Sequence, residues 1–200
     1  MKTICGFFLT GLAAMLCCGF APPSLRPVES KPVIIEGLEF SVVTEADWNP
    51  NFSRGSDVPL VLQLKIRNTK DAAMLFPTFD SFSPVLTDST GKELRMGGGR
   101  DGTMITPNIL ILPGKDFSYQ IEARIRIKWE KTGKRLEIVI KDGTGTEYAG
   151  GVEAGVCRIG FQLSPTHFEF AKEGKLEAKL WGASGKTEFV EITIHPIQKR

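Results

Sequence analysis

Strict alternation of apolar and polar residues over positions 117–129 constrains this chain more than any other feature. The stretch "FSYQIEARIRIKW" places apolar side chains at every second position from Phe117 to Trp129, and polar or charged side chains between them. A helix would scatter both sets around its axis, whereas a strand separates them onto two faces. The stretch therefore predicts a long β-strand with one face in a core and the other in water.

The same period of two recurs along most of the chain. "KTGK" (131–134) turns the chain into a second alternating stretch at 136–140, which predicts a β-hairpin. Further strands are expected at 38–42, 60–66, 84–88, 108–112, 156–163, 176–181 and 188–194. Turn residues separate them at 88–92, 112–116, 142–145, 172–175 and 182–186. The glycine-rich stretch 145–155 is expected to be a loop.

Many short strands without a long helical stretch predict an all-β fold, an antiparallel two-sheet sandwich of the immunoglobulin-like kind. Residues 33–197 are expected to form a single sandwich domain, with order beginning near Val33. The preceding stretch 22–32, "PPSLRPVESKP", is rich in proline and is interpreted as a tether.

The first 21 residues, "MKTICGFFLTGLAAMLCCGFA", resemble a secretory signal peptide. Lys2 precedes an apolar run that ends in small residues, and the run is shorter than the roughly 20 apolar residues of a membrane span. Cleavage after Ala21 is expected, with Gly19 as the alternative. The mature protein should then be secreted or periplasmic and have no membrane span. A lipid anchor at Cys17 or Cys18 is the minority interpretation, because Ala14-Met15-Leu16 fits that signal poorly.

Removal of this leader changes both the charge and the cysteine content. The formal charge of +2 loses the +1 of Lys2 and becomes +1, so the protein has no strong field to hold a nucleic acid. Three of the 4 cysteines lie in the leader and Cys157 alone remains, which excludes an internal disulfide.

One glycine pattern, Gly97-x-Gly99-x-x-Gly102, has the spacing of a dinucleotide-binding turn. Such a turn must lead into a helix whose N-terminal N–H groups meet the pyrophosphate. The residues that follow, "TMITPNILILPG", contain β-branched side chains and Pro107, so they cannot supply that helix. The glycines are interpreted as a hairpin connection, and no cofactor is expected.

Other catalytic signatures are equally weak. "GASG" (182–185) resembles a nucleophile elbow, but Lys186 occupies the position that needs the last glycine, and the stretch lies between expected strands. His167 and His195 have no metal-binding motif around them. Four aspartates fall in or beside expected turns, where aspartate is common: Asp80, Asp88, Asp101 and Asp142. We expect no catalytic residues, no metal and no enzymatic activity.

The expected hairpin carries the one local excess of positive charge. Its cations are Arg124, Arg126, Lys128, Lys131, Lys134 and Arg135, set against Glu122 and Glu130. A solvated outer face that discourages edge pairing is the simpler interpretation. The alternative is a weak binding site for an acidic protein or a polysaccharide, formed by Arg124, Arg126, Lys128 and Lys131, with Arg100 and Asp101 of the glycine stretch as further contacts. An N-glycosylation sequon begins at Asn51.

Residues 58–118 contain "VLQLKIRNTK", "DSTGK" and "ILPGKDF". This succession of an Asn-Thr turn, an Asp-x-x-Gly-Lys hairpin and a Pro-Gly corner resembles the immunoglobulin-like domains of bacterial extracytoplasmic proteins. It is distantly similar to the BsuPI-type proteinase inhibitor family. The resemblance implies the sandwich fold, but the inhibitory loop of that family has no residue-by-residue match here.

The function expected from the sequence is therefore that of a secreted or periplasmic, non-enzymatic binding or structural module. Its partner would be a protein or a cell-surface polymer, held by end loops or a sheet edge. A proteinase inhibitor or a hydrolase with an unidentified loop site is the alternative.

Overall fold

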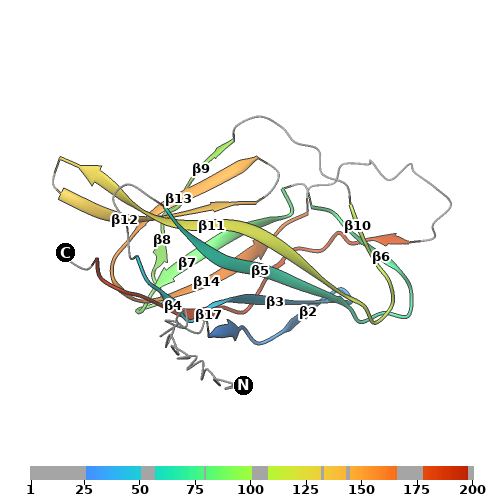
Figure 1. Cartoon of the computed structure of the whole chain (residues 1–200). Helices are drawn as coiled ribbons and strands as arrows, with labels where there is room; N and C mark the ends of the chain where they lie inside the picture. Colours follow the sequence, from blue (N-terminus) through green and yellow to red (C-terminus); the bar gives the residue numbers. More distant parts are fainter. Residues whose placement is uncertain are drawn as a thin grey trace, which may run out of the picture.

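The computed structural model describes residues 26–50, 57–78, 80–100, 108–131, 133–142, 145–165 and 178–197. Every regular element within these ranges is a β-strand, which confirms the predicted all-β class (Figure 1). Several sequence-based expectations lie outside the described residues, namely the signal segment 1–21, the sequon at 51–53, Asp101, Gly102, His167 and the turn at 172–175.

The largest sheet has eight strands in the order β1-β3-β5-β11-β12-β13-β9, with β2 also paired to β3. Its strands are β1 (Pro27–Glu29), β2 (Val33–Ile35), β3 (Leu38–Glu45), β5 (Val58–Asn68), β9 (Gly97–Arg100), β11 (Asp116–Glu130), β12 (Gly133–Lys141) and β13 (Thr146–Val152). All pairs in this sheet are antiparallel. Strand β11 contains the alternating stretch of the sequence and forms the predicted hairpin with β12.

Two further sheets complete the fold. A six-stranded sheet contains β4 (Asp47–Trp48), β17 (Val190–Ile194), β14 (Gly155–Leu163), β7 (Phe82–Asp88), β8 (Glu93–Leu94) and β16 (Gly185–Lys186). A small sheet contains β10 (Ile109–Ile111), β6 (Met74–Phe76) and β15 (Lys179–Leu180). Two pairs, β15 with β6 and β17 with β4, are parallel. The architecture is thus predominantly, but not entirely, antiparallel.

One apolar cluster draws on all three sheets. The alternating side chains of β11 enter it as predicted, since Ile121, Ala123 and Ile125 are 4 %, 3 % and 0 % exposed. At the end of the fold near β6 the rings of Phe40, Phe76 and Trp181 pack together, with centroids 5.2–5.9 Å apart. Burying three rings in mutual contact contributes several kcal/mol, at roughly 1.5–3 kcal/mol for each large side chain.

Asn68 and Thr69, the Asn-Thr pair of the sequence, hydrogen-bond to the backbone of several turns. The fully buried Asn68 donates from its Nδ2 to the carbonyl oxygens of Ala72 at 2.8 Å and Ile111 at 2.9 Å. Its Oδ1 accepts the backbone N–H of Lys70 at 2.9 Å. Thr69 donates from its backbone nitrogen and its hydroxyl to the carbonyl of Gly37, both at 2.9 Å. The Asn-Thr pair therefore has a structural role, because it satisfies buried polar groups.

Three expectations about irregular segments differ from the structure. The predicted loop at 145–155 is wrong, because it forms β13 and the first residue of β14. The hairpin connection expected at Gly97 and Gly99 is also wrong, because these residues lie in β9, paired with β13. Within the expected tether, β1 pairs with β3, so the sheet begins before Val33. Main-chain hydrogen bonds to a neighbouring strand override the weak strand propensity of glycine and proline here.

Candidate binding site at the β11–β12 hairpin

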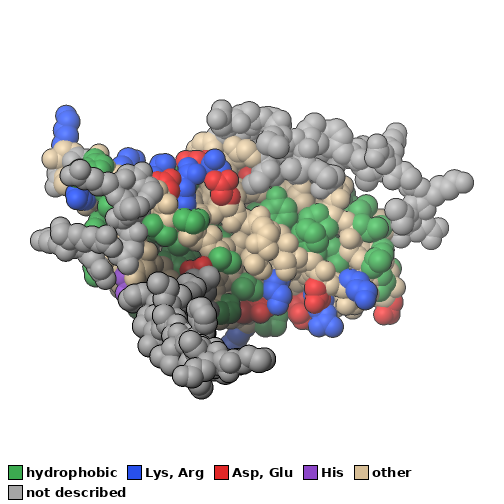
Figure 2. Space-filling model, viewed as in Figure 1, with side chains coloured by type: hydrophobic (Ala, Val, Ile, Leu, Met, Phe, Trp, Pro, Cys, Tyr) green, Lys and Arg blue, Asp and Glu red, His purple; other side chains and the backbone are tan. Residues whose placement is uncertain are grey.

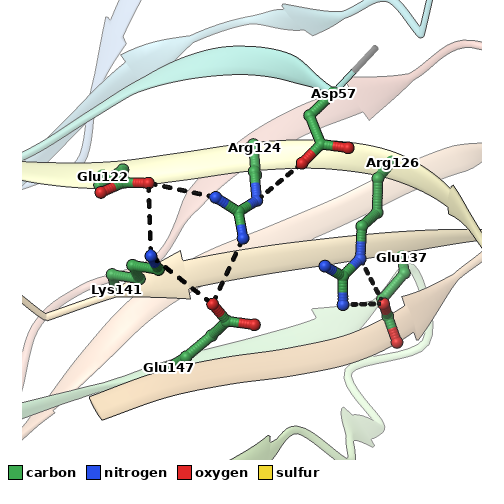
Figure 3. A network of polar contacts seen from close by, with 7 residues as sticks. All are labelled: Asp57, Glu122, Arg124, Arg126, Glu137, Lys141 and Glu147. Carbon is green, nitrogen blue, oxygen red and sulfur yellow. Dashed lines mark hydrogen bonds and ion pairs between the residues drawn. The ribbon is translucent and has the colours of Figure 1, made fainter. Parts of the chain in front are cut away.

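Three of the cations predicted to bind a partner, Arg124, Arg126 and Lys128, form a row on the outer face of β11, and each has a carboxylate partner. Figure 3 shows the partners of Arg124 and Arg126. Arg124 is the most heavily engaged. Its Nε lies 2.9 Å from Asp57, its Nη1 3.2 Å from Glu122 and its Nη2 3.3 Å from Glu147. This guanidinium joins β11 to β13 across the intervening strand β12.

Arg126 and Lys128 share a single carboxylate, Glu137 of β12. Arg126 Nη2 lies 2.7 Å and Lys128 Nζ 3.0 Å from its oxygens, and only 7 % of the Glu137 side chain is exposed. Burial alone would raise the pKa of this carboxyl group. The hydrogen bonds and positive charges of Lys128 and Arg126 outweigh burial, so the pKa of Glu137 lies below its ordinary value.

The outer face of this sheet therefore carries a balanced set of charges. Lys141 extends the network, with Nζ 3.9 Å from Glu122 and 3.8 Å from Glu147. Figure 2 shows positive and negative side chains interspersed on the visible face of the molecule. This arrangement favours the interpretation of Arg124, Arg126 and Lys128 as a solvated face, and a role for them in binding a partner stays a prediction.

The remaining predicted contacts are dispersed. Lys131 is exposed in the turn after β11. Arg100 ends β9, opposite Thr146 of β13, and the register across the sheet continues from Glu147 through Lys141 to Glu122. Arg100 is therefore level with the middle of β11 and three strands away from it, whereas Lys131 follows the far end of that strand. The fold does not bring the two residues together.

Trp129 is the most exposed aromatic side chain of the described residues, at 72 %, although its place in the alternating pattern predicts a core-facing position. Along the core-facing positions of β11, Ile125 is fully buried, Ile127 is partly buried and Trp129 is open to solvent. The alternating pattern correctly assigns Trp129 to the core-facing side, but the hairpin extends past the core (Figure 1). Lys134, directly opposite in the hairpin, places its Nζ 4.4 Å from the centre of the indole ring.

A cleft of about 820 Å³ opens beside this hairpin. Its apolar lining comes from several segments, with Leu94, Leu136, Val152, Val156, Pro196 and Ile197 among the described residues. Its charged lining consists of Asp88, Lys92, Lys134, Arg135 and Glu153. The volume falls within the roughly 300–1,000 Å³ typical of ligand sites. Lys134 contacts Trp129 and also lines the cleft, so the exposed ring stands next to its mouth.

Cys157 also lines the cleft but is only 4 % exposed. Burial raises the pKa of its thiol, and the negative charge of Asp88 raises it further. Asp88 is held in its own turn, where it accepts hydrogen bonds from the Thr90 hydroxyl at 2.6 Å and the Lys92 backbone at 3.0 Å. Because the thiolate is the reactive form, this environment opposes a nucleophilic role for Cys157.

The other sequence motifs do not form a second site in the described part of the chain. His195 places Nε2 2.9 Å from Asp47 in an exposed pair. Among the described residues, no three His, Cys, Asp or Glu side chains gather closely enough to hold a metal ion. Gly97 and Gly99 lie in an antiparallel strand, and the "GASG" stretch leads from β15 into β16, whose first residue is Gly185.

No helix of the described ranges is long and apolar enough to cross a membrane. Comparison of the chain with protein family models, curated proteins and solved structures finds no match.

Proposed function

We propose that this chain is an extracytoplasmic, non-enzymatic binding module of immunoglobulin-like sandwich architecture that holds a protein or a cell-surface polymer. The observation that carries the proposal is Trp129, 72 % exposed at the end of a long hairpin and next to a cleft of about 820 Å³. Exposing an indole to water is unfavourable, and tryptophan is enriched among the residues that dominate binding interfaces.

The charges around the cleft support binding more than catalysis. Asp88 is engaged by its own turn, and the raised pKa of Cys157 disfavours its thiolate. A hydrolase or a proteinase inhibitor would need an activated group or an inhibitory loop in addition to this cleft. The described lining of the cleft offers apolar surface, three cations and the carboxylates of Asp88 and Glu153, which can hold a ligand.

A photo-crosslinking amino acid placed at position 129 in the native host tests the binding proposal. We expect covalent adducts with an envelope protein or polymer. The matched control carries the same group at position 110, because Leu110 is also exposed, at 38 %, and lies on β10 away from the cleft. Equal adduct formation at both positions, or none at 129, would contradict the proposal.

The extracytoplasmic location has its own test. Mass spectrometry of the protein from its host should show a chain that begins near Pro22, because Lys2 and the apolar run after it favour export and cleavage. An intact Met1 on a protein in the cytoplasm would refute export, and a lipid on Cys17 or Cys18 would establish the anchored form.

A further inference from the structure

The cleft beside Trp129 combines an apolar floor with cations at its rim. Leu136 and Val152 are 6 % and 4 % exposed and belong to the continuous core cluster, so the floor is firmly supported. Lys92, in the turn between β7 and β8, and Lys134, on β12, are exposed and line the cleft from opposite segments of the chain. The cations Lys92, Lys134 and Arg135 outnumber the carboxylates of Asp88 and Glu153 in the lining, so a ligand with apolar groups for the floor and negative charge near Lys134 complements the cleft.

Lys134 differs from Arg124, Arg126 and Lys128 of the same hairpin in having no ion pair with a described residue. Arg124, Arg126 and Lys128 all contact carboxylates, whereas no described carboxylate lies within 4.0 Å of Lys134 Nζ. This ammonium group lies 4.4 Å from the centre of the Trp129 indole ring. The cation–π contact stabilises the group but leaves its positive charge unneutralised. Lys134 therefore remains available to a ligand carboxylate.

The shape of the site distinguishes a peptide from a polysaccharide. Sugar rings stack on open aromatic faces, but no aromatic side chain is among the described residues that line the cleft, and Lys134 lies over the ring of Trp129 beside it. An apolar floor is better matched by the side chains of an extended peptide, which point alternately to opposite sides. Such a segment can place a bulky side chain on Leu136 and Val152 while the adjoining carboxylate reaches the rim.

We propose that the cleft binds a short extended peptide segment of a partner protein, in which an acidic residue adjoins a bulky apolar residue. This inference rests on the proposed binding function and names the ligand class of that same site.

A capped hexapeptide that alternates leucine and aspartate tests the inference with the purified protein. Binding is read from tryptophan emission, because Trp129 is exposed while Trp48 and Trp181 are fully buried, and it is confirmed by calorimetry. We expect saturable binding that weakens with added salt. The same peptide with asparagine in place of aspartate should bind about tenfold more weakly, because it lacks the charge.

Variants locate the binding within the cleft. Lys134→Gln should weaken the aspartate peptide about three- to tenfold. Lys115→Gln removes one exposed cation from the turn before β11 and should leave the affinity unchanged. Glu153→Lys adds a cation to the rim and should strengthen binding, which provides a gain of function that misfolding cannot imitate. Thermal melting checks that each variant is folded.

Four outcomes would overturn the peptide inference: no saturable binding, equal affinity for both peptides, equal effects of Lys134→Gln and Lys115→Gln, or weaker binding by Glu153→Lys. Binding of an oligogalacturonate that depends on Lys134, without peptide binding, would also overturn it while leaving the proposed module intact. Failure of the crosslink at position 129 despite peptide binding would instead refute the proposed function in the host.

Discussion

At the scale of single residues, Glu137 shows how burial and pairing compete. Its carboxylate is nearly buried, and isolated burial of that charge would cost several kcal/mol. Arg126 and Lys128, two residues apart on β11, face it across the hairpin. Arg126 is directly opposite Glu137 in the register of the two strands. The carboxylate therefore stays ionised and joins β12 to β11.

Glu137→Gln should lower the free energy of unfolding by about 1–2 kcal/mol at pH 7, since Arg126 and Lys128 lose a charged acceptor but stay partly exposed. The folded-state pKa of Glu137 is lowered, so its contribution is complete above the unfolded pKa of about 4.3 and is lost as pH falls through the folded value. Urea unfolding should thus show a smaller difference from wild type at pH 2.5 than at pH 7.

The matched control for this variant is Glu122→Gln. The Glu122 side chain is 62 % exposed, so its loss should change stability by no more than about 0.5 kcal/mol. A Glu137→Gln effect as small as this, or one that grows in acid, would show that the ion pairs contribute nothing net.

Cys157 carries a second prediction at this scale. Because burial raises the pKa of the thiol, little thiolate forms at pH 8, and the side chain is only 4 % exposed. An aromatic disulfide reagent should label native protein far more slowly than protein in urea. Rapid native labelling would mean that the cleft opens down to the thiol.

At the scale of elements, the alternation of apolar residues was sufficient to predict β3, β5, β11, β12, β14 and β17. It failed for β9 and for β13, which contain the sequences GGGR and TEYAGGV. Glycine has no side chain to reveal a period, so these strands are specified by their hydrogen-bonded neighbours and not by their own residues.

The candidate site was likewise only partly predictable from the sequence. Its hairpin cations were predictable, but the cleft draws on distant segments that only tertiary packing assembles.

The placement of Gly99 in an edge strand predicts tolerance to substitution. A Cβ added there would meet no atom within 4 Å, and the residue is not at positive φ. Gly99→Val should therefore change the free energy of unfolding by less than about 0.5 kcal/mol, because valine suits a strand.

Gly37→Ala is the contrasting variant. Gly37 has a φ of 90° between β2 and β3, so alanine there should cost about 1 kcal/mol or more. Chemical denaturation of both variants measures these changes. A larger loss of stability for Gly99→Val than for Gly37→Ala would contradict the placement of β9 in the sheet.

At the scale of the whole molecule, the eight-stranded sheet extends further than the six-stranded sheet at the β11–β12 hairpin (Figure 1). Core-facing side chains remain buried while β11 lies over the shared core and become exposed at Trp129, past its end. The same overhang gives Lys134 and Leu136 access to the cleft. A single difference in sheet extent therefore accounts for both the exposed ring and the adjacent hollow, which is why a local sequence window could assign the direction of Trp129 but not its exposure.

Thermal melting of the whole molecule also tests whether the glycine pattern that resembles a nucleotide-binding turn binds a nucleotide. A ligand that binds only the folded state, present at a hundred times its dissociation constant, adds about 2.7 kcal/mol of stability, which melting experiments detect. Gly97 and Gly99 lie in a strand whose backbone pairs with β13, whereas a pyrophosphate-binding motif places its glycines in the turn before a helix. We expect millimolar NAD or ATP to leave the melting temperature unchanged in wild type and in Gly99→Val. A saturable nucleotide-dependent rise that Gly99→Val abolishes would require β9 to leave the sheet on binding, and would overturn both the strand assignment and the non-enzymatic proposal.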